Sequence, residues 1–220
     1  MILTARKLKL LEPAADCGLC PRLVEFRETN RRLYPTFENA PVPSFGGRDA
    51  ELLIVGLAPG LKGANQTGRP FTGDYAGDLL YPTLIKFGFA KGRFGATRDD
   101  GLVLHNCRIT NAVRCVPPAN KPTGPEAATC RPFLVSEIES MPHLKVLLAL
   151  GGLAHNAILT TFNARKTDFK FRHEARHTLP NGLILADSYH CSRYNTNTGR
   201  LTTPMFEQVF TNLQPLFARK

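Results

Sequence analysis

The sequence predicts an α/β fold: a single domain over residues 1–220, with three αβα layers around a central four-stranded parallel sheet. Two patterns support this prediction. Short apolar runs alternate with segments in which apolar residues recur at a helical spacing. Polar motifs directly follow the apolar runs, as expected where parallel strands all end at one edge of a sheet. A chain of 220 residues is also long enough to bury a substantial core.

Apolar runs predict the four strands, at residues 51–56, within 103–113, at 145–150 and at 183–188. Runs of this kind are typical of strands that are covered by helices on both faces. Helical segments separate the runs from one another, and this alternation favours parallel pairing through crossover connections.

Five segments predict the helices, at residues 14–33, 76–89, 125–141, 153–162 and 204–217. In the second segment Leu79, Leu80 and Leu84 recur at the spacing of one helix face. The last segment is amphipathic. Between the first helix and the first strand, Pro41 and Pro43 interrupt regular structure and predict a loop.

The chain is basic, with a formal charge of +10 from 28 Lys and Arg against 18 Asp and Glu. This charge favours a polyanionic partner, of which nucleic acid is the commonest. The basic residues are dispersed rather than gathered in a tail, which predicts a charged face. The sequence contains no secretory signal and no membrane-spanning run, so we expect a cytoplasmic protein that binds no membrane. We also expect it to be a monomer.

The most informative segment is the loop after the first predicted strand, with GLAPG at 56–60 and GRPFTGD at 68–74. Its glycines allow backbone N–H groups to approach a ligand closely. Open α/β sheets bind their ligands at this end of the strands. The loop is not a P-loop, because no Gly-Lys-Ser/Thr ends it. It is not a dinucleotide fingerprint either, because Pro59 interrupts that spacing.

Three further side chains follow or flank predicted strand ends. Asn111 ends the second strand, where its amide can pair with a nucleobase edge or cap a turn. Phe71, placed among glycines, can stack on a flat ligand or belong to the core. His190 follows the fourth strand and opens a polar, basic segment. We expect these side chains to meet in one cleft, because parallel strands end at one edge.

Four of the six cysteines are paired by spacing: Cys17 with Cys20 as C-x2-C, and Cys115 with Cys130 as C-x14-C. In a reducing compartment such pairs indicate a metal or cluster rather than disulfides. Spacing alone leaves iron and zinc open, since both accept four thiolates. Cys107 lies in an apolar run and is predicted to be a small core residue.

Four motifs, in order along nearly the whole chain, resemble those of the uracil-DNA glycosylase superfamily. They are GLAPG at 56–60, GRPFTGD at 68–74, TNAVRCVPPANKPTG at 110–124 and YHCSRYNTNTGR at 189–200. The greatest similarity is to the iron–sulfur type called family 5, or the B-type enzyme. One position departs from the pattern, because Cys191 follows the motif histidine where the superfamily often has proline.

The resemblance implies a monofunctional DNA repair glycosylase. Such an enzyme flips uracil and related deaminated or damaged bases out of DNA and hydrolyses the N-glycosidic bond, leaving an abasic site. Single- or double-stranded DNA would be the partner, with Arg193, Tyr194, Asn195 and Arg200 as the residues that bind it.

The resemblance also assigns roles in the cleft. Phe71 would stack on the flipped base, and Asn111 would hydrogen-bond the Watson–Crick edge of that base. Backbone N–H groups near Gly56 and Leu57 would hold a carbonyl oxygen. His190 would donate a hydrogen bond to the base oxygen on which negative charge grows during cleavage.

Asp74 is the implied catalytic carboxylate, which would stabilise the sugar cation and orient water. Its alternative role is to cap the helix predicted from residue 76. Other branches of the superfamily carry Asp, Asn or Glu early in the first motif, where this chain has Ala58 and Pro59, which cannot activate water. Asn120 is a second candidate for this task.

A [4Fe–4S] cluster is the implied cofactor, with Cys17, Cys20, Cys115 and Cys130 as its ligands. Its expected role is structural, tying the N-terminal helix to the loop after the second strand. Two other classes of function remain possible from the residues alone. One is a nucleic-acid-binding module without catalysis, and the other is a redox protein that uses the cluster for electron transfer.

Overall fold

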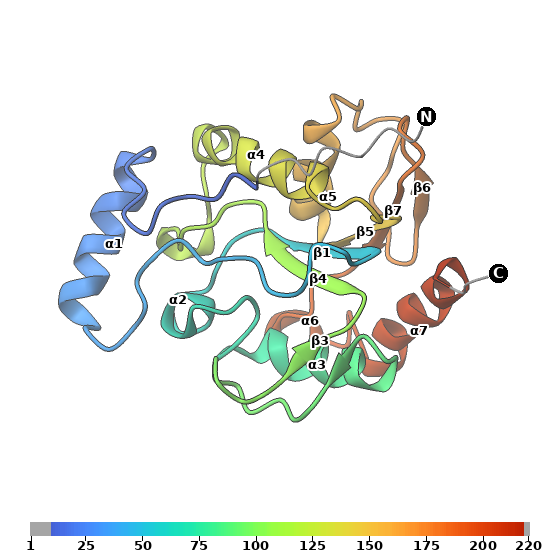
Figure 1. Ribbon diagram of the computed structural model, residues 1–220, viewed down its shortest axis with the longest axis horizontal. Helices are drawn as coiled ribbons and strands as arrows, with labels where there is room; N and C mark the ends of the chain where they lie inside the picture. The colour runs from blue at the N-terminus through green and yellow to red at the C-terminus, as the bar shows by residue number, and fades with distance from the viewer. Residues whose placement is uncertain (1–9, 218–220) are drawn as a thin grey trace, which may run out of the picture.

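The computed structural model describes residues 10–217 (Figure 1). Its central sheet has the strand order β4 (Cys107–Asn111), β1 (Leu52–Gly56), β5 (Val146–Leu150), β7 (Ile184–Ser188) and β6 (Arg176–Thr178). The first four strands pair in parallel, as predicted. The predicted number of four strands is wrong, because β6 adds an antiparallel fifth strand at one edge. The sequence of β6, Arg-His-Thr, is polar and offers no apolar run to signal a strand.

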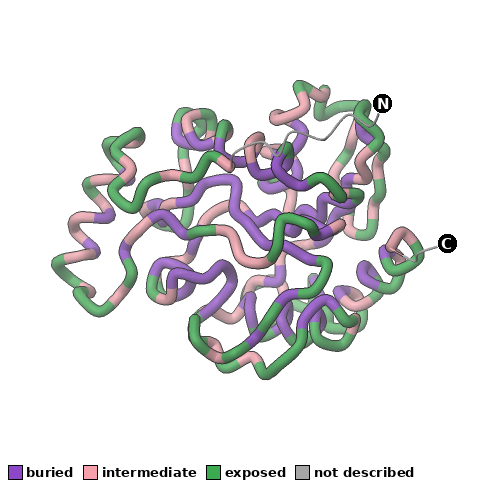
Figure 2. The backbone as a smooth tube through the Cα atoms, in the orientation of Figure 1, coloured by how far each residue is buried: buried purple, intermediate pink, exposed green. Residues whose placement is uncertain are grey.

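Helices cover both faces of the sheet, as the three-layer prediction requires. They are α3 (Tyr75–Lys86) and α7 (Thr203–Leu213) on one face, and α4 (Gly124–Glu139) and α5 (Gly152–Thr161) on the other (Figure 1). Alternate residues of β1 supply the two cores: Leu52 and Ile54 pack with α3 and α7, and Leu53 and Val55 pack with α4 and α5. Both cores lie along the purple, buried centre of Figure 2.

The remaining elements are short, apart from the first helix. They are α1 (Pro21–Leu33), α2 (Ala64–Thr67), α6 (Arg193–Asn197), a small antiparallel sheet of β2 (Ala90–Lys91) and β3 (Val103–Leu104), and 3-10 turns at Pro118–Asn120 and Gln214–Leu216. Helix α1 begins later than the predicted residue 14. Proline is preferred in the first helical turn, where its missing N–H costs nothing. The C-x2-C pair therefore precedes the helix instead of lying within it.

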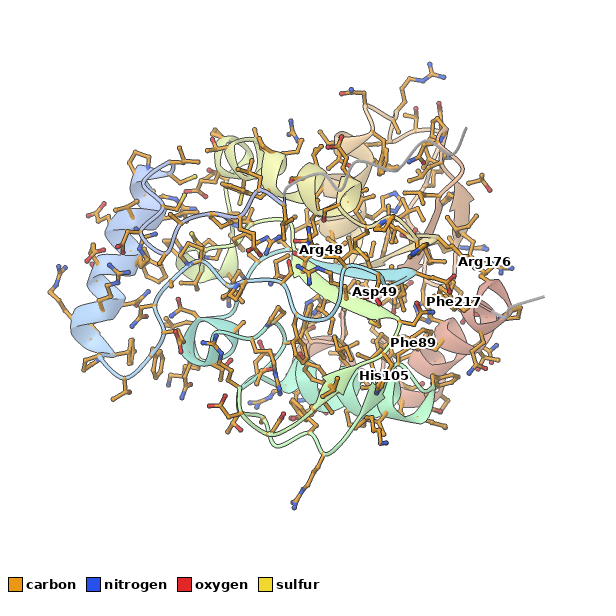
Figure 3. All side chains as sticks on the ribbon, viewed as in Figure 1. Arg48, Asp49, Phe89, His105, Arg176 and Phe217 are labelled. Carbon is orange, nitrogen blue, oxygen red and sulfur yellow. The ribbon has the colours of Figure 1, made fainter. Side chains whose placement is uncertain are left out.

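Aromatic contacts hold the end of the chain against the sheet. The rings of Phe89 and Phe217, both labelled in Figure 3, meet edge to face with their centroids 5.3 Å apart. Phe210 of α7 lies 6.1 Å from Phe89 and 5.7 Å from Phe87. Edge-to-face pairs of this kind contribute about 0.5–1.5 kcal/mol beyond the area they bury. They fix α7 beside α3.

Residues 1–9, on which the prediction about export rests, lie outside the described residues, as do residues 218–220. Within residues 10–217 no helix has both the length and the apolar character that a membrane span needs.

A buried ion-pair network joins α4 to the strand that carries Asn111. The carboxylate of Glu137 accepts hydrogen bonds from Arg108 of β4, from Arg114 at 2.6 Å and from Ser44 at 2.6 Å. Burial would raise the pKa of Glu137, but the charges of Arg114 and Arg108 hold it below its ordinary 4.5. Glu137 is therefore ionised in the folded protein at neutral pH.

Replacing Glu137 by glutamine is expected to lower the free energy of unfolding by about 3–5 kcal/mol, because two buried guanidinium groups lose their counter-charge. Urea denaturation at pH 7 measures this. The contribution is present above the unfolded pKa near 4.5 and disappears as pH falls through the lower folded value. Glu139→Gln, at an exposed position of the same helix, is the matched control. Equal stability of the two variants would remove this network from the account.

Candidate active site

The carboxyl ends of β1, β4, β5 and β7 lie at one edge of the sheet, where a hollow of about 490 Å³ opens. Sites for small ligands typically enclose about 300–1,000 Å³. The predicted residues that line this hollow are Leu57, Phe71, Asp74, Asn111, His190, Asn195 and Arg200. The structure thus brings together segments that are far apart in the sequence. Arg193 and Tyr194 lie outside the hollow, on the neighbouring surface of α6.

Gly56 lets an aromatic ring and an amide come together in this hollow. A Cβ atom on Gly56 would lie 2.4 Å from Asn111 Oδ1 and 2.6 Å from Phe71 Cζ, which is too close for any larger residue. Phe71 has a φ of +51°, a left-handed conformation that costs about 1–2 kcal/mol. Strain of this kind concentrates at functional sites. Within the described residues, no protein group hydrogen-bonds the Asn111 amide, so its donors and acceptor face the hollow.

Asp74 caps α3 and borders the hollow with the same carboxylate. Its Oδ1 accepts a hydrogen bond from the N–H of Ala76 at 3.1 Å, as expected of an N-cap. Its Oδ2 lies so close to Gly63 that a Cβ there would come within 2.4 Å. Burial raises the pKa of Asp74 above its ordinary 3.8, while the N–H groups of Ala76 and Gly77 act in the opposite direction. The carboxylate can therefore serve as cap and as catalytic group.

His190 stands directly after β7, with its ring centroid 6.1 Å from that of Phe71. Burial lowers the pKa of His190 below 6.5, so the imidazole is neutral at pH 7. A neutral imidazole donates one hydrogen bond from its ring. The amide of Asn195 donates to the backbone carbonyl of His190 at 2.8 Å, which fixes the segment that carries the ring. Asn195 was predicted to bind DNA, and here part of its amide has a positioning role.

Of the other predicted DNA-binding residues, Arg200 lines the hollow, and Arg193 and Tyr194 belong to α6, whose Asn195 also lines it. The guanidinium of Arg200 lies 4.8 Å above the ring of Tyr189, and that of Arg193 lies 5.4 Å above the ring of Tyr75. Tyr194 is 72% exposed, which is unusual for so large a ring. Cations and an exposed aromatic ring side by side suit contact with a nucleic acid.

Asn120 also lines the hollow, in the 3-10 turn Pro118–Asn120. Its φ is +56°, and asparagine tolerates this left-handed conformation better than most residues do. The second candidate for positioning water thus lies in the same hollow as Asp74.

The four paired cysteines line one small cavity between α1, the loop after β4 and α4. Leu23, Val113 and Phe133 pack around it. All the cysteines are free thiols, and burial raises the pKa of Cys115 to about 12. Thiols in such surroundings stay protonated at neutral pH until a bound cation favours the thiolate.

The sulfur atoms of these cysteines are not gathered as tightly as a single zinc ion requires. A tetrahedral zinc site with bonds of about 2.3 Å places its sulfurs about 3.8 Å apart. Among the described residues, three donor atoms within 4.8 Å of one another occur only at His155, His177 and Asp187.

The sequence analysis did not predict one wall of the hollow. Phe171, from the segment after α5, lines the hollow, and a buried histidine anchors this segment. His155 Nδ1 lies 2.7 Å from Asp187 Oδ1, and His155 Nε2 lies 2.8 Å from the carbonyl oxygen of Phe169. Both partners accept hydrogen bonds, so both ring nitrogens carry protons. Burial would lower the pKa of His155, but Asp187 raises it overall. The sequence did offer one signal for this anchor. Asp187 stands inside an apolar strand, where a buried carboxylate needs a partner.

Comparison with known proteins agrees with this geometry. Residues 43–214 match the family model described as the uracil DNA glycosylase superfamily. The chain belongs to this superfamily. It is 44% identical over 205 residues to the type-5 uracil-DNA glycosylase of Thermus thermophilus, which covers 91% of this chain and 93% of that protein.

Two further relatives carry the same name. The type-5 uracil-DNA glycosylase of Mycobacterium tuberculosis is 40% identical, over 91% of this chain and 78% of its own length. That of Pyrobaculum aerophilum is 37% identical, over 88% of this chain and 86% of its own length. The family identified from the motifs is confirmed.

Proposed function

We propose that this chain removes uracil, and related deaminated or damaged bases, from DNA by hydrolysing the N-glycosidic bond and leaving an abasic site. The convergence of Phe71, Asn111, Asp74 and His190 on one hollow carries this proposal. We further propose that the protein works as a single domain and as a monomer in the cytoplasm, where thiols stay reduced.

The hollow would hold the base after it leaves the duplex. The ring of Phe71 offers a stacking surface, and such stacking is worth about 1–3 kcal/mol per base. The Asn111 amide hydrogen-bonds the Watson–Crick edge, and a bidentate contact contributes about 1–3 kcal/mol of discrimination. Backbone N–H groups at Gly56 and Leu57 hold a carbonyl oxygen. Together these contacts offset the few kcal/mol that base flipping costs.

Cleavage moves the electron pair of the glycosidic bond onto the departing base and leaves positive charge on the sugar. His190, neutral at pH 7, donates a hydrogen bond to the base oxygen where negative charge accumulates. The Asp74 carboxylate stabilises the sugar cation and orients the water that attacks it. The water oxygen bonds to the sugar carbon, and its proton passes to the carboxylate. Asn120 is available to hold the same water.

The strand around the extruded nucleotide would lie across α6. Arg193 and Arg200 contact phosphates, Asn195 contacts the groove, and the exposed ring of Tyr194 enters it. The charge of +10 supplies sequence-independent affinity through the release of counterions.

Incubation with a duplex that contains one uracil, followed by hot alkali, tests the proposed function. We expect strand scission at the uracil and none in the same duplex with thymine. Tight binding of the uracil duplex without an alkali-labile site would favour a binding module over a glycosylase. Strand scission before alkali would contradict a monofunctional enzyme.

We propose that Cys17, Cys20, Cys115 and Cys130 hold a [4Fe–4S] cluster. The cavity that the four cysteines line together supports this assignment. When bound, the cluster supplies cross-linking rather than bond cleavage. Its ligands join the loop before α1 to the loop after β4 and to α4, away from the hollow.

Cys17→Ala is expected to lose iron and the visible absorption of the protein, and to lower Tm by about 10 °C or more, since loss of a bound metal group costs about 4 kcal/mol or more. Cys107→Ala, at a buried cysteine outside the cavity, is the control and keeps the absorption. Iron analysis and thermal melting measure both effects. A folded Cys17→Ala protein with its full metal content would contradict the assignment. Stoichiometric zinc in the wild-type protein would show that the cysteines bind zinc and not an iron–sulfur cluster.

A further inference from the structure

Arg69 is a buried cation in the same motif as Phe71 and Asp74. Only 3% of its surface is exposed, and its guanidinium donates two hydrogen bonds to the carboxylate of Asp100, at 2.8 and 2.6 Å. Hydrogen bonds from Arg69 lower the pKa of Asp100 to about 2, so both groups are charged at neutral pH. A fork of two parallel hydrogen bonds fixes the direction of both side chains.

Three aromatic rings enclose the guanidinium of Arg69. Its central carbon lies 5.1 Å from the ring centroid of Phe45, 5.2 Å from that of Tyr81 and 5.8 Å from that of Phe94. The rings of Tyr81 and Phe94 stack with their centroids 4.6 Å apart. Aromatic faces attract a cation, and rings on several sides leave it little room to move. The ion pair is therefore held in one place.

The backbone is tied to this pair on both sides of Phe71. After it, the hydroxyl of Thr72 accepts a hydrogen bond from Arg69 Nε at 2.8 Å. Before it, the carbonyl oxygen of Pro70 accepts one from the hydroxyl of Tyr81 at 2.6 Å. Phe71, with its φ of +51°, stands between these two fixed neighbours. A strained conformation of this kind persists only where the surrounding structure imposes it.

The other end of the pair is anchored in a distant segment. Asp100 accepts hydrogen bonds from the backbone N–H groups of Gly95 at 2.9 Å and of Leu102 at 3.0 Å. Within residues 10–217, neither Arg69 nor Asp100 is among those that line the active-site hollow. Any effect of the pair on a bound base must therefore pass through the loop that carries Phe71.

We propose that Arg69 is a positioning residue, which together with Asp100 holds the ring of Phe71 in place to stack on the extruded base. This rests on the proposed function. A buried ion pair contributes little net stability compared with apolar residues of similar volume. Apolar side chains can repack, whereas a forked ion pair specifies one arrangement. The pair therefore contributes to excision through Phe71, and its contribution should disappear when that ring is removed.

A double-mutant cycle with Phe71 tests this, measured as single-turnover excision of uracil from a duplex. Asp100→Asn removes the charge and keeps the shape. We expect it to slow excision at least tenfold while the Kd of the duplex stays within a factor of two. In a Phe71→Leu background the same change should slow excision less than twofold, because no ring is left to position. Asp99→Asn, at the exposed neighbouring acid, is the matched control and should have no effect.

An ion pair that only supported the fold would slow excision equally in both backgrounds, and that result would overturn the proposal. An unchanged rate in Asp100→Asn would overturn it as well. If Asp100→Asn does not fold, Arg69→Lys replaces it in the cycle. Lysine keeps a cation opposite Asp100 but loses the fork and the hydrogen bond to Thr72, so its loss of rate should depend on Phe71 in the same way.

Fluorescence tests the position of the ring without any need for activity. The chain contains no tryptophan, so Phe71→Trp introduces a single emitter at this position. Adding Asp100→Asn should shift its emission to longer wavelength and raise acrylamide quenching at least twofold, whereas adding Asp99→Asn should change neither. Unchanged emission and quenching would overturn the positioning role. A wild-type protein that leaves uracil in DNA would instead reject the proposed function, and this fluorescence test would still decide the role of Arg69 and Asp100.

Discussion

Replacing Asp74 by asparagine is expected to reduce uracil excision about 10²–10⁴-fold while duplex binding stays within a factor of two, because general-base help of that size is lost. Asparagine keeps the side-chain oxygen that accepts the N–H of Ala76, so α3 retains its cap. The substitution therefore removes the charge and spares the fold. Asp74→Ala should lose the same activity and about 1 kcal/mol of stability besides.

The pH profile distinguishes catalysis by Asp74 from a purely structural role. Burial raises the pKa of Asp74 above 3.8, so the ionised form disappears earlier as pH falls. Excision by the wild type should decline as pH drops through this raised value, and the residual rate of Asp74→Asn should show no such decline. Glu139→Gln, at an exposed position outside the hollow, is the control. Full activity of Asp74→Asn would mean that Asn120 or another group orients the attacking water.

His190→Ala is expected to slow excision about 10²–10³-fold, the loss typical of one preorganised donor to a developing negative charge. Binding of the uracil duplex should change much less, because the hydrogen bond strengthens only as charge develops. Single-turnover rates and binding isotherms at one fixed salt concentration measure the two effects.

The leaving base gives a sharper test of His190. A 5-fluorouracil base carries negative charge more readily than uracil does, so it depends less on a donor. The loss caused by His190→Ala should therefore shrink on 5-fluorouracil substrates. His143→Ala, at an exposed histidine, is the matched control. An equal loss on both bases would mean that His190 shapes the hollow instead of stabilising the leaving group.

Much of the site could be predicted from the sequence because of one topological rule. Gly56, Asn111 and His190 each end or follow a buried strand, and parallel strands finish at one edge. The alternation of apolar runs and helical segments was enough to find those strands. The motif resemblance then added roles that position alone does not give.

The rest depended on tertiary contacts that leave little local signal. Strand β6 is polar and pairs only because β7 offers it an edge. The anchor formed by His155, Asp187 and the carbonyl of Phe169 joins residues from three segments, and none of them stands in a motif. The late start of α1 was foreseeable from Pro21.

The most direct measurement is the crystal structure of the Asp74→Asn variant bound to a duplex with one uracil. If distant segments build a chamber for an extruded base, the uracil ring will lie against Phe71, with its edge on the Asn111 amide and an oxygen near His190. A uracil that remains stacked in the DNA duplex, or that binds elsewhere on the protein, would contradict the claim that this hollow holds the extruded base.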